Sequence, residues 1–207
     1  FMAATMTYDM TNTDKLNGFR QELDRLGIRL LAPDINKSRH DFSVEIMPDG
    51  SHAVRYALAA LKNVGEGAMR ALVEERDRGG PFKDLVDLAR RLDARQLNRR
   101  QVENMVKAGV FDSLDKNRGK VFKNVEALLR FSANEAQDRE SNQISMFGGA
   151  SHPAIKLENA PDWSPHERLN QEFEAIGFYL SAHPLDAFAK SLKRLGALKV
   201  SELPRHL

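Results

Sequence analysis

Two glycines, Gly65 and Gly67, separate two short apolar repeats, and no other feature constrains the fold of this chain as strongly. Apolar side chains recur on both sides of them at the three-to-four spacing of a helix face. These positions are Leu58, Leu61, Val64, Ala68, Ala71 and Leu72. Because glycine lets the backbone turn sharply without Cβ atoms, the pattern predicts a helix, a tight turn and a second helix. The second helix would begin with exposed N–H groups at its positive dipole end.

An exposed helix N-terminus of this kind favours an anion, and a phosphate oxygen is a natural ligand for it. Ala71, four residues after Gly67, is small enough to let the two helices pack closely. The resulting G-x-G-x-x-x-A pattern is typical of the helix-hairpin-helix motif, which binds DNA irrespective of its sequence. We therefore expect the residues around the turn to contact a DNA backbone. They are Lys62, Asn63, Gly65, Gly67 and Arg70.

The two glycines also allow interpretations other than DNA binding. A glycine often ends a helix as a C-cap without binding any ligand. A dinucleotide-binding loop needs a buried strand before it and a third glycine where this chain has Arg70, so that interpretation fails. Glu66 stands between the glycines, where the motif usually has an apolar residue. Its carboxylate must therefore point away from a bound phosphate.

Residues 97–111 resemble a second, degenerate copy of the same unit. Asn98 is expected to take the turn in place of glycine, because asparagine tolerates a left-handed backbone better than most residues. Two such units can pack as a pseudo-symmetric pair, each offering a helix N-terminus to one strand of a duplex. Arg99 and Arg100 are then expected phosphate contacts, and Arg95 is a weaker candidate. The alternative is a plain helix whose arginines only face solvent.

The charge distribution agrees with a phosphate-facing surface. The 207 residues carry a net charge of only +2, but residues 52–130 hold 17 Lys and Arg against 11 Asp and Glu. The basic excess therefore falls on the segment that contains the glycine turn. Charged residues that merely solvate helices would give a similar excess, so the distribution is supporting evidence only.

Composition excludes several classes of protein. A chain of this length can bury a core and form one or two domains. The lack of cysteine excludes disulfides and thiolate metal sites, and it suits a reducing cytoplasm. No apolar run is long enough to cross a membrane, and the start does not resemble a signal peptide. Because the chain opens on Phe1 rather than Met, we expect it to be a piece of a longer protein.

The periodicity along the chain predicts a mainly α fold. It would consist of tandem helix-hairpin-helix units, a small β-hairpin over residues 42–56 and an extended linker over residues 132–165. The linker is expected because residues 132–140 are polar and residues 148–165 are rich in Gly, Pro, Ser and Ala. Helical spacing resumes in the tail, from residue 166 onward.

An apolar pentapeptide interrupts the expected linker. Its residues are Gln143, Ile144, Ser145, Met146 and Phe147. Apolar anchors on an exposed segment usually bind the pocket of a partner protein. The order of side chains is that of sliding-clamp-binding peptides, in which the glutamine amide bonds to the clamp and the last two side chains fill an apolar pocket. The alternative is that Met146 and Phe147 fold back onto the core of their own domain.

Taken together, these segments resemble the replicative alpha-subunit family of bacterial DNA polymerase III over essentially the whole chain. The similar segments, in family order, are residues 1–4, 12–15, 26–28, 33–36, 55–67, 97–100, 108–112, 143–147, 177–180 and 183–184. The resemblance implies four parts. They are the end of the fingers domain (1–50), a tandem helix-hairpin-helix DNA-binding unit (51–131), an exposed linker with the clamp-binding peptide (132–165), and a helical tail (166–207) that leads to an OB-fold absent from this chain.

The resemblance also implies chemistry and partners. In the family, DNA-directed DNA polymerisation uses two Mg²⁺ ions held by palm carboxylates, which would lie upstream of this chain. We therefore expect no catalytic residue, no metal ligand and no cofactor among these residues. The implied partners are duplex DNA of any sequence, the sliding clamp (beta subunit) and other holoenzyme subunits, and no membrane.

Two rival functions and two isolated residues complete the expectations. A stand-alone helix-hairpin-helix glycosylase or nuclease would need a catalytic Asp or Lys beside the turn. A purely structural module would pack its hairpins against the rest of the polymerase instead of DNA. His183, before Pro184, is expected to serve a turn or packing role, and Trp163 to cover an apolar surface.

Overall fold

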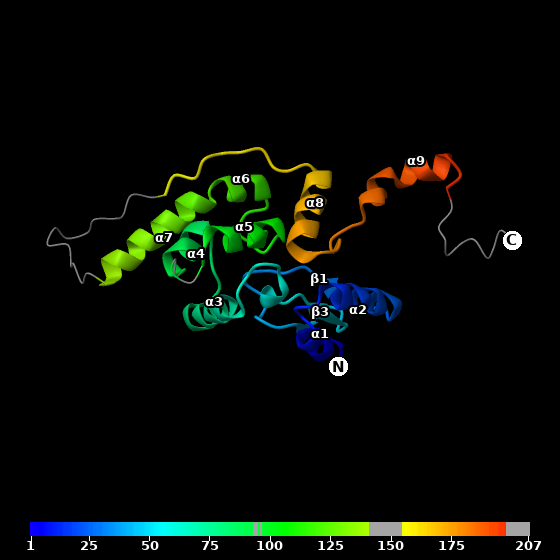
Figure 1. Ribbon diagram of the computed structural model, residues 1–207, viewed down its shortest axis with the longest axis horizontal. Coiled ribbons are helices and arrows are strands. Elements are labelled where there is room, and N and C mark those ends of the chain that lie inside the picture. The colour runs from blue at the N-terminus through cyan, green and yellow to red at the C-terminus, as the bar shows by residue number, and fades with distance from the viewer. Residues whose placement is uncertain (93–94, 96, 141–154, 198–207) are drawn as a thin grey trace.

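Helices dominate the computed structural model, which describes residues 1–92, 95, 97–140 and 155–197 (Figure 1). The helices are α1 (Met2–Tyr8), α2 (Thr13–Arg25), α3 (Glu66–Gly79), α4 (Leu85–Arg91), α5 (Arg99–Lys107), α6 (Arg118–Lys123), α7 (Val125–Glu140), α8 (Pro165–Ile176) and α9 (Ala189–Arg194). Two 3-10 helices are η1 (Leu58–Ala60) and η2 (Pro184–Phe188). The predicted mainly α class is confirmed. None of the described helices is long and apolar enough to cross a membrane.

A three-stranded sheet lies beside α1 and α2 near the N-terminus. Its strands are β1 (Leu30–Leu31), β2 (Ser43–Ile46) and β3 (His52–Arg55), in the order β1-β3-β2. The antiparallel pairing of β2 with β3 places Val44 opposite Val54 and confirms the predicted β-hairpin. β1 pairs with β3 in parallel, and α2 connects α1 to this part of the sheet.

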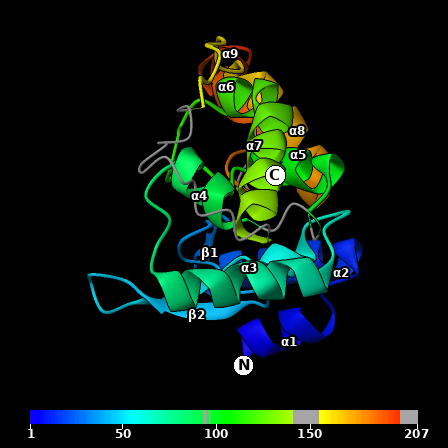
Figure 2. The same cartoon turned by 90° about the vertical axis from the view of Figure 1, so that its left-hand side faces the viewer.

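One continuous core joins the sheet to the helices. Its fully buried side chains come from distant parts of the chain, namely Met6, Leu16, Tyr56, Met69, Met105 and Ile176. Figure 2 shows α3 running across the lower half of the view, beneath α4, α5 and α7. The turn that precedes α3 contacts α5 and α8, because the backbone of Lys62 bonds to Asn104 and to Ala175.

The first part of the expected linker is helical, which corrects the prediction. α7 continues through Ser132 to Glu140, and the Ser132 hydroxyl is buried and donates a 2.8 Å hydrogen bond to the carbonyl of Leu92. Residues 132–140 contain no Gly or Pro to stop a helix. Asn134 and Gln137 are exposed on α7, so polar residues of this segment face solvent from a helix rather than from a linker.

The last part of the expected linker is extended but packed against α6, which is a second correction. The Asn124 side chain accepts a hydrogen bond from the N–H of Glu158 and donates one to its carbonyl, both at 2.8 Å. Trp163 packs against Phe122 with the two rings tilted by 58° and 5.4 Å between their centroids, in agreement with its expected covering role. These bonds join residues 34 positions apart, so the local composition could not predict them. The pentapeptide at residues 143–147 lies outside the described residues.

The tail contains one packed helix and one exposed segment. α8 is capped by the Ser164 side chain and buries Ala175 and Ile176 in the main core. In η2 and α9 none of the residues is buried. His183 caps η2, because its Nδ1 accepts the N–H of Leu185 at 3.2 Å, so the expected turn role is confirmed.

Candidate nucleic-acid interface

The turn before α3 differs from the predicted glycine hairpin. The segment predicted as a preceding helix forms only the single turn η1, and Asn63 adopts the left-handed conformation with a φ of 59°. Gly65 has an extended backbone (φ −76°, ψ 135°) and is the N-cap of α3, while Gly67 lies inside its first turn. Asparagine tolerates positive φ through its short polar side chain. Gly65 and Gly67 instead leave the start of α3 without side chains of their own.

The start of α3 is open, as the sequence predicted. Among the described residues, no side chain caps it, whereas side chains cap α2, α4, α5, α6 and α8. Gly65, Glu66 and Gly67 are all exposed, and a Cβ atom on Gly67 would meet nothing within 4 Å. The first N–H groups of α3 and its positive dipole end therefore face solvent.

Glu66 and Arg70 neutralise each other on the surface of α3. The Arg70 guanidinium lies 2.8 Å from the Glu66 carboxylate, and both side chains are about half exposed, at 52% and 51%. The carboxylate is thus held along the side of the helix by a partner one turn away. An exposed pair of this kind is weak, so a phosphate can compete for Arg70.

The second unit begins differently from the prediction. Asn98 has an extended backbone (φ −86°, ψ 167°), so the expected left-handed turn at this residue is wrong. Its side chain accepts the N–H of Gln101 at 3.0 Å, and the Gln101 side chain accepts the N–H of Asn98 at 2.8 Å. This capping box uses donors that would otherwise be available to an anion. The N-terminus of α5 is consequently less open than that of α3.

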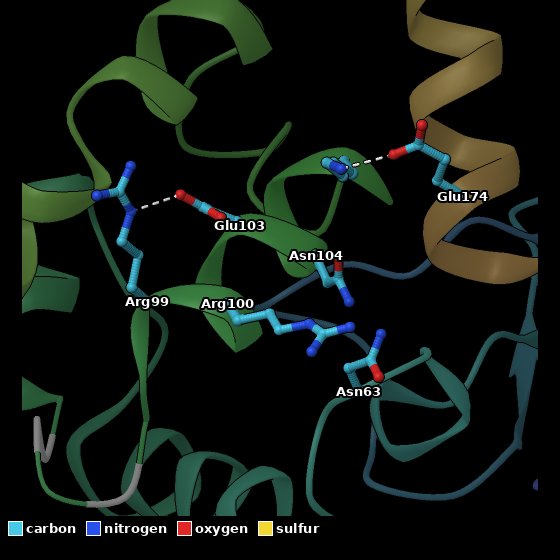
Figure 3. Close-up of a pocket in the computed structure, with 7 residues that line it drawn as sticks. Asn63, Arg99, Arg100, Glu103, Asn104 and Glu174 are labelled. Atoms are coloured by element: carbon cyan, nitrogen blue, oxygen red, sulfur yellow. Dashed lines mark hydrogen bonds and ion pairs between the residues drawn. The ribbon is translucent and has the colours of Figure 1, made fainter.

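The two helix starts are nevertheless neighbours. A Cβ atom on Gly65 would lie 3.5 Å from Nε2 of Gln101, in ordinary contact. Between the turn and α5 lies a solvent-open pocket of about 510 Å³ (Figure 3). The residues that line it are Asn63, Arg99, Arg100, Glu103, Asn104, Lys107 and Glu174. The structure thus brings Asn63 together with the two predicted arginines.

Arg99 and Lys107 are both ion-paired at this pocket. Arg99 lies 2.7 Å from Glu103 and 3.4 Å from Glu126, and the hydrogen bond that it donates to Glu103 raises the pKa of Arg99. Glu103 is therefore an ion-pair partner of Arg99. Lys107 lies 2.6 Å from Glu174 of α8.

Arg100 is in a different state. It forms no ion pair within the described part of the chain, and its guanidinium extends toward Asn63 across the pocket (Figure 3). A phosphate in this pocket would therefore meet a cation whose charge is not already compensated.

Lys62 does not line the pocket, although the sequence placed it among the DNA contacts. Its backbone N–H donates to the carbonyl of Ala175 at 2.9 Å. Its ammonium nitrogen would lie 2.9 Å from a Cβ atom on Gly177, which ends α8. A cation at a helix C-terminus is favoured by the dipole, so Lys62 serves the junction with α8.

Comparison with known proteins agrees with this geometry. The family described as the helix-hairpin-helix motif matches residues 27–121. A DNA polymerase III subunit alpha of Caulobacter vibrioides is 40% identical over 205 residues, covering 98% of this chain and 17% of the relative. The proteins of the same name from Pasteurella multocida and Haemophilus influenzae are each 39% identical over 207 residues, covering 98% of this chain and 18% of the relative. The chain belongs to the DNA polymerase III alpha-subunit family.

This member of the alpha-subunit family spans less than a fifth of its relatives' length. Within the described residues, no group of three or more His, Asp or Glu side chains is placed to hold a metal ion. These residues therefore offer no site that fits the two Mg²⁺ ions implied by the family.

The basic excess of the alpha-subunit chain is partly structural. Arg55, Arg76 and Arg118 are buried and bind carbonyl oxygens of the fold, with Glu45 and Asp112 as additional partners of the first and last. Counting charges along the sequence thus overstates the charge available to DNA. The sequence prediction also missed Asn104 and Lys107, whose only signal was helical spacing from Arg100.

Proposed function

We propose that this chain binds the phosphate backbone of duplex DNA, independently of sequence, as part of a bacterial replicative DNA polymerase. The single observation that carries the proposal is the adjacency of the uncapped α3 N-terminus and the uncompensated Arg100. Backbone N–H groups and an arginine are both strong donors to phosphate oxygens. The helix-hairpin-helix family match over residues 27–121 supports the same ligand.

The predicted contacts divide into a central and a peripheral group. The N–H groups around Gly65 and Gly67, together with Asn63 and Arg100, form the central group. Arg70 and Arg99 first have to leave their carboxylate partners, so they are peripheral contacts. Asn98 would support the site by capping α5, and Lys62 would support it through its junction with α8. Neither residue is proposed to contact DNA directly.

The parent protein is proposed to be a DNA-directed DNA polymerase, a proposal supported by the relatives, which are named DNA polymerase III subunit alpha. Residues 1–50 would end the fingers domain, and residues 51–131 would grip the duplex. Polymerisation would depend on palm carboxylates and Mg²⁺ outside this chain. Other holoenzyme subunits are proposed partners of the whole protein.

A second attachment is proposed at Gln143, Ile144, Ser145, Met146 and Phe147, which would bind the sliding clamp. The chain is fixed to the fold on both sides of this peptide, by the buried Ser132 in α7 and by the backbone of Glu158, which bonds to Asn124. Two weak attachments on one chain act multivalently, because rebinding of either one is effectively intramolecular. The polymerase would thereby stay on its template.

The DNA-binding proposal is tested by fluorescence anisotropy of the chain with two unrelated duplexes over a range of salt concentrations. Equal affinities for the two duplexes are expected, with log affinity falling by about 0.9 per contacted phosphate for each unit of log salt. Arg100→Ala should lower the affinity and make this slope shallower. Arg130→Ala is the control, because Arg130 is 76% exposed and paired with Glu126 on α7. A slope of zero, or equal losses in both variants, would contradict phosphate binding by this site.

A further inference from the structure

The turn that carries Asn63 is held from two sides. The N–H of Lys62 donates to the carbonyl of Ala175 in α8 at 2.9 Å. The carbonyl of Lys62 accepts a 2.7 Å hydrogen bond from the side-chain amide of Asn104 in α5. Both polar groups of the residue just before the left-handed Asn63 are therefore satisfied by other helices.

Asn104 is unusual for a polar residue in the middle of a helix. It is buried, with 8% of its surface exposed, and it bonds a residue 42 positions away. A buried amide that lost this partner would leave the Lys62 carbonyl unpaired, which is costly. The bond thus strongly favours one position of the turn relative to α5.

The same face of α5 carries Arg100. Residues four apart lie on one helix face, so Arg100 and Asn104 are vertical neighbours, and both line the pocket shared with Asn63. Lys107 extends this face and fixes it to Glu174 of α8 at 2.6 Å. The spacing between the Arg100 guanidinium and the α3 N-terminus therefore depends on the Asn104 hydrogen bond.

We propose that Asn104 is a positioning residue for the DNA-binding surface. Its amide holds the turn at residues 62–65 against α5, so that the α3 N-terminus and Arg100 meet the DNA backbone at one fixed spacing. This inference rests on the proposed function. Asn104 itself would not contact DNA, and α8 would help to support the DNA-binding unit.

The test uses Asn104→Leu in the 207-residue chain, because leucine keeps the approximate volume and the helix propensity but cannot donate. Asn124→Leu is the matched control, since Asn124 is 3% exposed and bonds the distant backbone of Glu158 in the same way. Two quantities are measured: duplex-DNA affinity, and the rate of amide hydrogen exchange at residues 62–65. If leucine prevents folding, alanine at both positions gives the same comparison.

Asn104→Leu is expected to weaken DNA binding about tenfold, the equivalent of one lost buried hydrogen bond. Exchange at residues 62–65 should accelerate in this variant and not in Asn124→Leu. A merely structural role would lower the stability of both variants without this local change in exchange. Unchanged affinity and exchange in Asn104→Leu would overturn the inference. A third outcome separates this inference from the proposed function. If the wild-type chain fails to bind DNA but exchange still accelerates in Asn104→Leu, the proposed function is overturned, whereas the role of Asn104 in fixing the turn is supported.

Discussion

The Glu66 carboxylate lies 2.8 Å from the Arg70 guanidinium, one helical turn further along α3. The pair stands at the open N-terminus of this helix, where the dipole attracts anions. If the turn binds DNA as proposed, Glu66 opposes a bound phosphate both through its own charge and by occupying Arg70. The proposed site therefore contains an internal competitor for the phosphate.

Removing this competitor should strengthen DNA binding. Glu66→Gln eliminates the negative charge and frees Arg70, and we expect roughly two- to fivefold higher affinity for duplex DNA. Anisotropy at constant salt measures the change. Glu74→Gln, at an exposed position on the same helix, is the control for the overall loss of one negative charge. Equal effects of the two substitutions would show that Glu66 has no special place in the site.

A buried tyrosine offers a test of the core. Tyr56 is 0% exposed and packs edge-on against Phe42 with 5.0 Å between ring centroids, but its hydroxyl has no hydrogen-bond partner among the described residues. Tyr56→Phe should therefore raise the free energy of unfolding by about 1 kcal/mol. Urea denaturation measures this change. Tyr8→Phe, at a position that is 90% exposed, should leave stability unchanged.

Tyr56 should also make the free energy of unfolding depend on pH. Burial raises the pKa of Tyr56 above the ordinary value of 10.0, because the phenolate is disfavoured in the apolar core. Above about pH 10 the unfolded chain loses this proton while the folded chain keeps it, so stability falls as pH rises. The stability advantage of Tyr56→Phe over the wild type should widen in this range. A constant difference between pH 8 and pH 11 would contradict the burial of this hydroxyl.

Two helical glycines should respond oppositely to alanine. A Cβ atom on Gly119 in α6 would overlap the carbonyl oxygen of Pro161, whereas one on Gly18 in α2 would meet nothing within 4 Å. Gly119→Ala should lower the free energy of unfolding by about 1–3 kcal/mol. Gly18→Ala should raise it by about 0.5–1 kcal/mol through helix propensity. Thermal or urea unfolding of both variants decides whether residues 155–164 pack on α6 as described.

Substitutions in the proposed clamp peptide should weaken binding to the sliding clamp without weakening binding to DNA. Gln143→Ala combined with Phe147→Ala should reduce affinity for a bacterial sliding clamp at least tenfold, because anchor side chains dominate such interfaces. DNA affinity should not change. Leu185→Ala with Phe188→Ala is the control, since both side chains are exposed apolar groups elsewhere, at 53% and 57%. Biosensor measurements that show equal clamp binding by wild type and the peptide variant would remove this part of the proposal.

Two asparagines illustrate what the sequence could and could not predict. Asn98 followed by Gln101 is a local capping signature, and the expected left-handed conformation of Asn98 is wrong because this capping box holds the residue in an extended conformation. Asn63 takes that conformation instead, two residues before Gly65. Local patterns correctly predicted the β-hairpin and the open start of α3.

The remaining features depend on contacts between distant residues. The Asn104 bond to Lys62 and the Asn124 bonds to Glu158 join residues 42 and 34 positions apart. Contacts over such separations produce no periodic pattern in the sequence. For the same reason, residues 155–164 resembled a free linker although their backbone is held by side-chain amides. Likewise, only the structure distinguishes the paired Arg99 from the unpaired Arg100.

The most direct test of the central claim is an amide NMR titration of the chain with a short duplex. Shift changes are expected to concentrate at the backbone amides of Gly65, Glu66, Gly67 and Ala68, with a smaller set at Asn63 and Arg100, and to be the same for unrelated sequences. Changes confined to other surfaces, or none at DNA concentrations that saturate binding, would contradict a phosphate site at the start of α3.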